Sequence, residues 1–244
     1  MNIGLLLVAD ENDILERVLR GHRKMVDVFY VLDGTVPNRK SKRICTSSAI
    51  CAGYWTDADL PRPPYPEGTV CGYRGFIYDK AVEDHGYDHW FVELHGDEIW
   101  TVHPNQVIEE NPSADGFIFP LPFYFPRADE PWDDKVHPLD QLHWHMTPGW
   151  PEFRLFRGNP NVHFSPTQHF NTQPAGLTNV VQVTHPIRHY PYRSPKAQRQ
   201  KAELHTKTGF DPANYTHIVE RDEVFWTDAM IEAAKCQHHT AAVA

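Results

Sequence analysis

Ile3-Gly4-Leu5-Leu6-Leu7-Val8 begins the pattern that decides the fold. This apolar run has the length of a buried strand, and a polar turn follows it. Apolar residues then recur at helical spacing over 14–19, and a second apolar run occupies 26–32. Strand, helix and strand in this order predict a βαβ crossover with two parallel strands.

Acidic residues follow both of these strands. Asp10 and Glu11 come after the first strand, and Asp33 comes after the second. In an open α/β sheet, ligands bind outside the carboxyl ends of the strands. We therefore expect these acids to line one crevice.

A third strand, predicted over 88–93, leads into Leu94-His95-Gly96-Asp97-Glu98-Ile99. An imidazole and two carboxylates would thus lie at the same edge of the sheet. Such ligands suit Mn²⁺ or Mg²⁺, and a divalent cation is the usual partner of a diphosphate. Acids in this position are also typical of a solvated turn or of a first helical turn. The context favours a metal and nucleotide site.

The remaining elements are predicted from periodicity and composition. The stretch 36–72 is rich in Pro, Gly and short polar residues and predicts a surface loop without a long regular element. Helical spacing returns over 73–86, with Arg74 on the polar side. The proline-broken aromatic run 116–125 suits an edge or bent strand. Further predictions are a helix over 104–110, strands over 153–157 and 180–183, and late helices over 196–206 and 222–237.

These elements predict an α/β fold with a mostly parallel central sheet and helices on both faces. At 244 residues the chain can bury a sizeable core, and we predict one domain over 1–244. Its nucleotide-binding half is expected over about 1–100 and its acceptor-side half over about 101–244.

Composition excludes several classes of protein. The balance of 23 basic and 32 acidic residues gives a formal charge of -9, which disfavours nucleic acid as a partner. No apolar stretch approaches the roughly twenty residues of a membrane helix, and the start lacks the features of a signal peptide, so a cytoplasmic protein is expected. The four cysteines have irregular spacings with no CxxC, which indicates neither a zinc ribbon nor a redox pair.

Four motifs carry a resemblance to a known family. In chain order they are Ala9-Asp10-Glu11-Asn12, Val31-Leu32-Asp33-Gly34-Thr35, Trp90-Phe91-Val92-Glu93-Leu94-His95-Gly96-Asp97-Glu98, and His189-Tyr190-Pro191-Tyr192-Arg193-Ser194 with Gln198 and Lys201. Their order and spacing resemble the nucleotide-sugar glycosyltransferases of the GT-A fold, most closely the family 2 type. Two features depart from that pattern: His95 replaces the first acid of the DxD motif, and Thr35-Val36-Pro37 replaces the usual Ser-Thr-Asp.

The resemblance implies roles for individual residues. Asp97 would bind the metal directly, His95 would stand beside it in the motif, and His189 would close on the metal or the diphosphate. Asp10 or Glu11, together with Asp33, would line the pocket for the base and ribose, and Arg193 would face the phosphates. Apart from the resemblance, Arg74 on the polar side of the predicted helix is a further candidate for binding the nucleotide.

An inverting transferase also needs a base that takes the proton from the acceptor hydroxyl. We choose Glu152, which precedes a predicted strand, and keep Asp140 and His169 as alternatives. A glutamate in this position can instead form an ion pair with Arg154 or Arg157.

The leading hypothesis is a metal-dependent, inverting glycosyltransferase, using Mn²⁺ or Mg²⁺, that moves a sugar from a nucleotide-diphosphate donor to a glycan or other hydroxyl acceptor. A nucleotidyltransferase is the first alternative, although it normally has a Gly-rich basic loop after its first strand, where this chain has Asp10-Glu11-Asn12. The sixteen histidines suggest a metal hydrolase or metal-binding protein as another. The replacement by His95 also allows an inactive sugar-nucleotide binding module.

Overall fold

The computed structural model describes residues 1–9, 11–34, 39–61, 70–126, 131–146, 150–164, 174–194, 197 and 236–238. The chain divides into two compact units. The first consists of Met1–Pro120 with Pro151–Ile187, and the second of Leu121–Trp150 with Arg188–Ala244. The prediction of one domain with two sequential halves stays a prediction.

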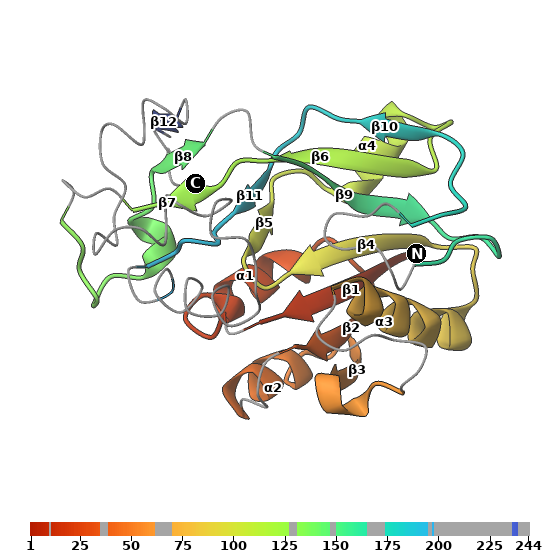
Figure 1. Cartoon of the computed structure of the whole chain (residues 1–244), viewed down its shortest axis with the longest axis horizontal. Helices are drawn as coiled ribbons and strands as arrows, with labels where there is room; N and C mark the ends of the chain where they lie inside the picture. The colour runs from red at the N-terminus through yellow and green to blue at the C-terminus, as the bar shows by residue number, and fades with distance from the viewer. Residues whose placement is uncertain are drawn as a thin grey trace, which may run out of the picture. The chain divides into compact units, whose positions relative to one another are not determined.

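A seven-stranded sheet forms the centre of the first unit, in the order β10-β6-β9-β4-β1-β2-β3 (Figure 1). The pairs β1–β2, β1–β4, β2–β3 and β10–β6 are parallel, whereas β9 runs antiparallel to β4. The predicted α/β class with a mostly parallel sheet is therefore confirmed. The strands are β1 Asn2–Val8, β2 Val28–Asp33, β3 Cys51–Thr56, β4 Trp90–His95, β6 Gly116–Leu121, β9 Trp150–Arg157 and β10 Val180–Gln182.

The predicted βαβ crossover is present, and it brings the ends of neighbouring strands to one edge of the sheet. Helix α1, Leu15–His22, connects β1 to β2. In the strand register, Leu7 lies beside His95 and Val8 lies beside Asp33. The ends of β2 and β4 thus meet at one edge of the sheet, one on each side of β1.

Helix α3, Val70–His85, covers one face of β1 and β2, in agreement with the helix predicted over 73–86. Figure 1 shows α3 in front of these strands. Ile3 and Leu5 lie in one buried cluster with Phe76, Ile77 and Ala81 of α3. Because successive side chains of a strand point to opposite faces, odd-numbered residues of β1 face α3. Burying each large apolar side chain contributes about 1.5–3 kcal/mol to folding.

The prediction of a loop over 36–72 is wrong in part. Helix α2, Arg39–Thr46, and strand β3, Cys51–Thr56, lie within it, followed by the 3-10 turn η1, Asp57–Asp59. Two apolar residues of α2, Ile44 and Cys45, are buried. They suffice to hold a short helix in place, although they are too few to give a periodic signal in the sequence.

The aromatic run 116–125 is not one continuous strand. It divides into β6 and β7, Tyr124–Phe125. However, β6 lies between β10 and β9 and is no edge strand. Pro120 is the penultimate residue of β6, where a missing N–H disturbs the sheet least.

Two further elements of the first unit, a short strand and a helix, follow β4 in the chain. Strand β5, Glu98–Trp100, follows β4 after a two-residue turn. Helix α4, Pro104–Glu110, has the predicted bounds. His103 caps its N-terminus, with Nδ1 accepting from the backbone N–H of Asn105. Proline at its first position fits a place where no N–H partner is required.

The second unit contains a small antiparallel sheet in the order β12-β8-β7. Strand β8 is Trp144–Met146 and β12 is Cys236–His238, so the last two residues of the helix predicted over 222–237 are extended instead. The rest of that helix, and the helix predicted over 196–206 apart from residue 197, lie outside the described residues. The unit also contains the 3-10 turn η2, Pro138–Asp140, and part of β11, Ile187–His189. None of the helices in the described ranges is long and apolar enough to span a bilayer.

Candidate functional site

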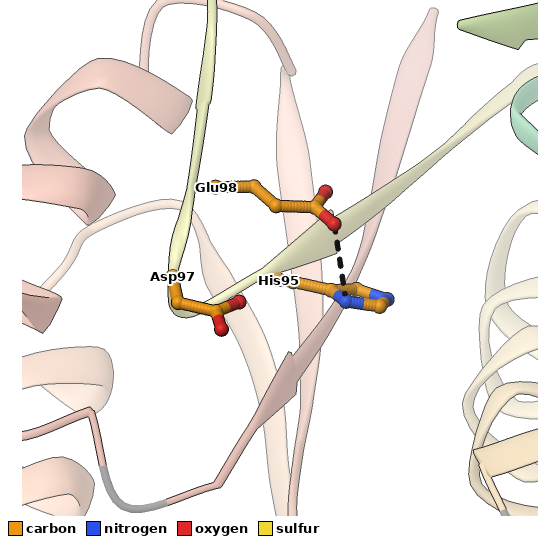
Figure 2. Close-up of side chains that lie close together, drawn as sticks. All are labelled: His95, Asp97 and Glu98. Atoms are coloured by element: carbon orange, nitrogen blue, oxygen red, sulfur yellow. Dashed lines mark ion pairs between the residues drawn. The ribbon is translucent and has the colours of Figure 1, made fainter. Parts of the chain in front are cut away.

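The turn between β4 and β5 brings three potential metal ligands together. His95 ends β4, Glu98 begins β5, and Asp97 lies in the turn between them. One ligand atom from each side chain lies within 4.8 Å of the other two. Figure 2 shows the three side chains around this turn, with the ion pair between Glu98 and His95 dashed. The sequence predicted this grouping from adjacency alone.

Arg154 of β9 anchors one of these carboxylates. Its Nε donates to Oε2 of Glu98 at 2.9 Å and its Nη2 to Oε1 at 2.7 Å. Both side chains are fully buried, and Nη2 also pairs with Glu152. The parallel arrangement of two charge-assisted bonds fixes the plane of the Glu98 carboxylate.

Arg74 lies beneath the same turn and is not on the polar side of its helix. It is 1% exposed, and its Nη2 lies 3.1 Å from Nε2 of His95. Its Nε lies 3.0 Å from Oε2 of Glu93 in an ion pair that lacks hydrogen-bond alignment. Glu93 and His95 are two residues apart in β4 and so face the same side of the sheet, the side that α3 covers. The ion pair with Glu93 and the contact with His95 explain why the Arg74 side chain is buried.

Burial dominates the electrostatics of the cluster. The pKa of the Glu93 carboxyl is raised by desolvation, although Arg74 and Arg154 act in the opposite direction. Burial alone would lower the pKa of Arg154, but Glu152 and Glu98 raise it above its ordinary value. Arg154 therefore stays a cation, and the carboxylates around it gain a fixed positive partner.

Glu11 brings a further carboxylate to the turn from the end of β1. It is 7% exposed, and its Oε2 accepts from the backbone N–H of Ala9 at 2.5 Å. A Cβ added at Gly96 would lie 2.7 Å from that oxygen, so the carboxylate packs directly on the turn. Asp10, the other acid predicted here, lies outside the described residues.

Asp33 lies at the predicted edge but has strong contacts of its own. It is fully buried, and its Oδ2 accepts from the hydroxyls of Ser41 and Tyr54, each at 2.5 Å. These donors come from α2 and β3, the two elements that the sequence did not predict. The carboxylate of Asp33 therefore joins β2 to its neighbours.

His22 is a contact of the site that the sequence reasoning missed. It is 1% exposed, and its Nε2 lies 3.0 Å from the carbonyl oxygen of Glu98. Burial lowers the pKa of His22 to about 4. The signal was present, because His22 continues the helical spacing of Leu15, Val18 and Leu19 on the buried face of α1.

The predicted site residues fall into both units. Glu152 lies in the first unit with the β4–β5 turn, is 9% exposed and pairs with Arg154, one of the two partners foreseen for it. Asp140, His189 and Arg193 lie in the second unit. Asp140 is exposed in η2, Arg193 is buried, and the ring of His189 packs edge-on against Phe123 at 4.9 Å. His169 lies outside the described residues.

The donor set around the turn fits a divalent cation. Five buried carboxylates face two buried guanidiniums in this cluster, so negative charge is in excess when all are ionised; they are Glu11, Glu93, Asp97, Glu98 and Glu152 against Arg74 and Arg154. An ionised carboxylate offers about four lone-pair sites, so Glu98 can keep Arg154 and still accept a further contact. Oxygen ligands with one imidazole suit Mn²⁺ or Mg²⁺.

No family model and no curated protein matches the sequence. Among solved structures, the chain is similar to HddC from Yersinia pseudotuberculosis, with a TM-score of 0.42 and 8% identity over 82% of this chain and 97% of that one. A protein from Desulfovibrio desulfuricans G20, provisionally described as a nucleotide-diphospho-sugar transferase, gives 0.40 and 14% over 77% and 81%. A protein from Bacillus anthracis, provisionally described as a glucose-1-phosphate thymidylyltransferase and solved with sucrose, gives 0.34 and 10% over 54% and 61%.

Proposed function

We propose that the chain is a metal-dependent glycosyltransferase of the GT-A type, which moves a sugar from a nucleotide-diphosphate donor to an acceptor hydroxyl. One observation carries the proposal: His95, Asp97 and Glu98 present their ligand atoms within 4.8 Å of one another at the carboxyl edge of a mostly parallel sheet. That edge is where open α/β sheets bind their ligands. The resemblance of the four sequence motifs to such transferases adds the chemical class.

The residues around the turn have separate tasks in this proposal. Asp97, 8% exposed, is the proposed direct ligand of the cation. Glu98 is held in position by Arg154, and Glu11 adds negative charge against the turn. A bound divalent cation would neutralise the charge that develops on the departing diphosphate. The protein's part is to hold these carboxylates ready, so that they need no rearrangement during the reaction.

Glu152 remains the proposed base of an inverting transfer. Of the three candidates it is the one that the described first unit places in the same charge cluster as Glu98, through Arg154. Its ion pair with Arg154 orients the carboxylate. The role predicts that Glu152→Gln loses turnover while nucleotide binding persists, whereas a purely structural pair would weaken both.

The experiment that tests the proposal combines binding with product analysis. Thermal unfolding would be followed with UDP, GDP, CDP and dTDP, each with and without Mn²⁺, because a ligand that binds only the folded state raises its melting temperature. We expect stabilisation that requires both nucleotide and metal and that is lost in Asp97→Asn. Asp88→Asn, which changes an exposed acid two residues before β4, is the matched control.

Sugar nucleotides would then be incubated with the protein and the products identified. Release of a nucleoside diphosphate supports sugar transfer or donor hydrolysis. Formation of pyrophosphate in the presence of a sugar phosphate and a nucleoside triphosphate would instead indicate a nucleotidyltransferase. Zinc binding without any nucleotide-dependent stabilisation would contradict the proposed function.

A further inference from the structure

The contacts of His95 with Arg74 and Glu98 determine which of its ring nitrogens carries the proton. A guanidinium donates and never accepts, so Nε2 of His95, 3.1 Å from Nη2 of Arg74, must be the unprotonated nitrogen. Nδ1 lies 3.3 Å from Oε1 of Glu98, an acceptor, and therefore carries the hydrogen. In this arrangement both ring nitrogens are engaged, and the lone pair that a cation would need points at Arg74.

Arg74 itself is an incompletely satisfied cation. It is 1% exposed, and among the described residues its Nε and Nη1 have no hydrogen-bond partner. Leaving buried donors of a charged group unpaired is costly, so an added anion would stabilise the side chain. The guanidinium geometry suits an oxyanion with two adjacent oxygens, such as a phosphate group.

We propose that Arg74 is a positioning residue that withholds Nε2 of His95 from a divalent cation until an oxyanion of the ligand engages the guanidinium. In the absence of ligand, His95 then lies between Arg74 and Glu98, with one ring nitrogen facing each of them. When an oxyanion draws Arg74 away, Nε2 becomes available. Cation and oxyanion therefore strengthen each other's binding. That the oxyanion is the diphosphate of a sugar nucleotide rests on the proposed function.

The tautomer can be measured on the unaltered protein. In ¹⁵N-histidine NMR spectra without metal, the signals that disappear in His95→Gln identify His95. We expect these signals to show a protonated Nδ1 and an unprotonated Nε2. A protonated Nε2 would overturn the proposal, and this result does not depend on any variant of Arg74 being folded.

The competition is tested with Arg74→Lys, which keeps a positive partner for Glu93 but lacks the forked guanidinium. Binding of Mn²⁺ alone would be measured by electron paramagnetic resonance. Because lysine lacks the Nη2 atom that faces Nε2, we expect the affinity to rise by about tenfold. The gain should vanish in Arg74→Lys combined with His95→Gln. An unchanged affinity, or a gain that survives without His95, would contradict the proposal.

Arg157→Lys is the control, since Arg157 pairs with Asp88 at an exposed position of the same sheet. It should leave Mn²⁺ affinity as in the unaltered protein. Pyrophosphate and each of UDP, GDP, CDP and dTDP are then added in turn. Tighter Mn²⁺ binding with either, reduced in Arg74→Lys, supports the coupling. If pyrophosphate acts and no nucleoside diphosphate does, the role of Arg74 stands and the proposed function fails.

Discussion

Arg154 and Glu98 form a two-point ion pair, with N···O distances of 2.9 and 2.7 Å, in which neither side chain is exposed. The pair joins β9, the antiparallel strand, to the first residue of β5. It holds the β4–β5 turn to the sheet from the side opposite to β1. Because the pair is buried, we expect its loss to lower the free energy of unfolding more than the loss of a surface ion pair would.

Arg154→Met is expected to lower the free energy of unfolding by about 3–5 kcal/mol, because it leaves buried carboxylates without their cation. Arg157→Met, which removes an exposed ion pair with Asp88, should cost less than about 1 kcal/mol. Urea unfolding followed by circular dichroism measures both. Equal losses in the two variants would show that burial of the Arg154 cluster carries no special weight.

Two tyrosines offer a matched test of hydrogen bonding at the sheet. Tyr54 donates to the buried carboxylate of Asp33 at 2.5 Å, whereas the buried hydroxyl of Tyr78 has no partner among the described residues. Tyr54→Phe should destabilise the protein by about 1.5–3 kcal/mol, the range for a hydrogen bond to a charged group. Tyr78→Phe should be neutral or stabilising. Thermal unfolding of the two variants under identical conditions tests this prediction. A larger loss of stability in Tyr78→Phe than in Tyr54→Phe would refute the assignment of these contacts.

The sequence could predict the frame of the fold because its main signals are local. The apolar run of β1, the helical spacing of α1 and the acids after β4 each depend on neighbours within a few residues. The elements α2 and β3 were missed because each is short, and each is stabilised by contacts with β2. Such tertiary stabilisation leaves little trace in a single sequence.

In the charge cluster, too, the sequence predicted only the contacts between residues that are close in the chain. Adjacency in the chain was enough to group His95 with Asp97 and Glu98. It gave no indication that Arg74 is buried, because a polar residue of α3 turns inward only when a strand places a carboxylate opposite it. Glu93 supplies that carboxylate from β4, and Arg154 approaches it from β9 at 3.8 Å. Pairings between residues this far apart follow from the fold and not from periodicity.

His22 predicts a specific loss of stability in acid. Its pKa is about 4 in the folded state against 6.5 ordinarily, so the unfolded state takes up the proton first as the pH falls. Stability should therefore decline between about pH 6.5 and pH 4, by roughly 3 kcal/mol in all, and this contribution should be constant at higher pH. His22→Gln should remove that part of the pH dependence, as measured by urea unfolding at several pH values. His89→Gln, at a half-buried position, controls for loss of an imidazole. An unaltered pH slope in His22→Gln would rule out the buried, uncharged histidine.

Gly96→Ala separates the stability of the β4–β5 turn from its binding capacity. The added methyl group would lie 2.7 Å from Oε2 of Glu11, at the far end of a flexible side chain, so the carboxylate must move and the backbone need not. Moving it breaks the contact between Glu11 and the N–H of Ala9, which should cost about 1–2 kcal/mol of unfolding free energy.

The effect of Gly96→Ala on ligands should be larger than this modest loss. If Glu11 supplies charge to a bound cation, displacing it should weaken Mn²⁺ and Mn²⁺–nucleotide binding by about tenfold, since a charged contact of this strength is removed from the site. Titration calorimetry at a temperature where the variant is fully folded gives the affinity. Glu11→Gln removes the charge without a new methyl group and should produce the same weakening. Binding that falls in Gly96→Ala but persists in Glu11→Gln would assign the effect to the shape of the turn and not to the charge of Glu11.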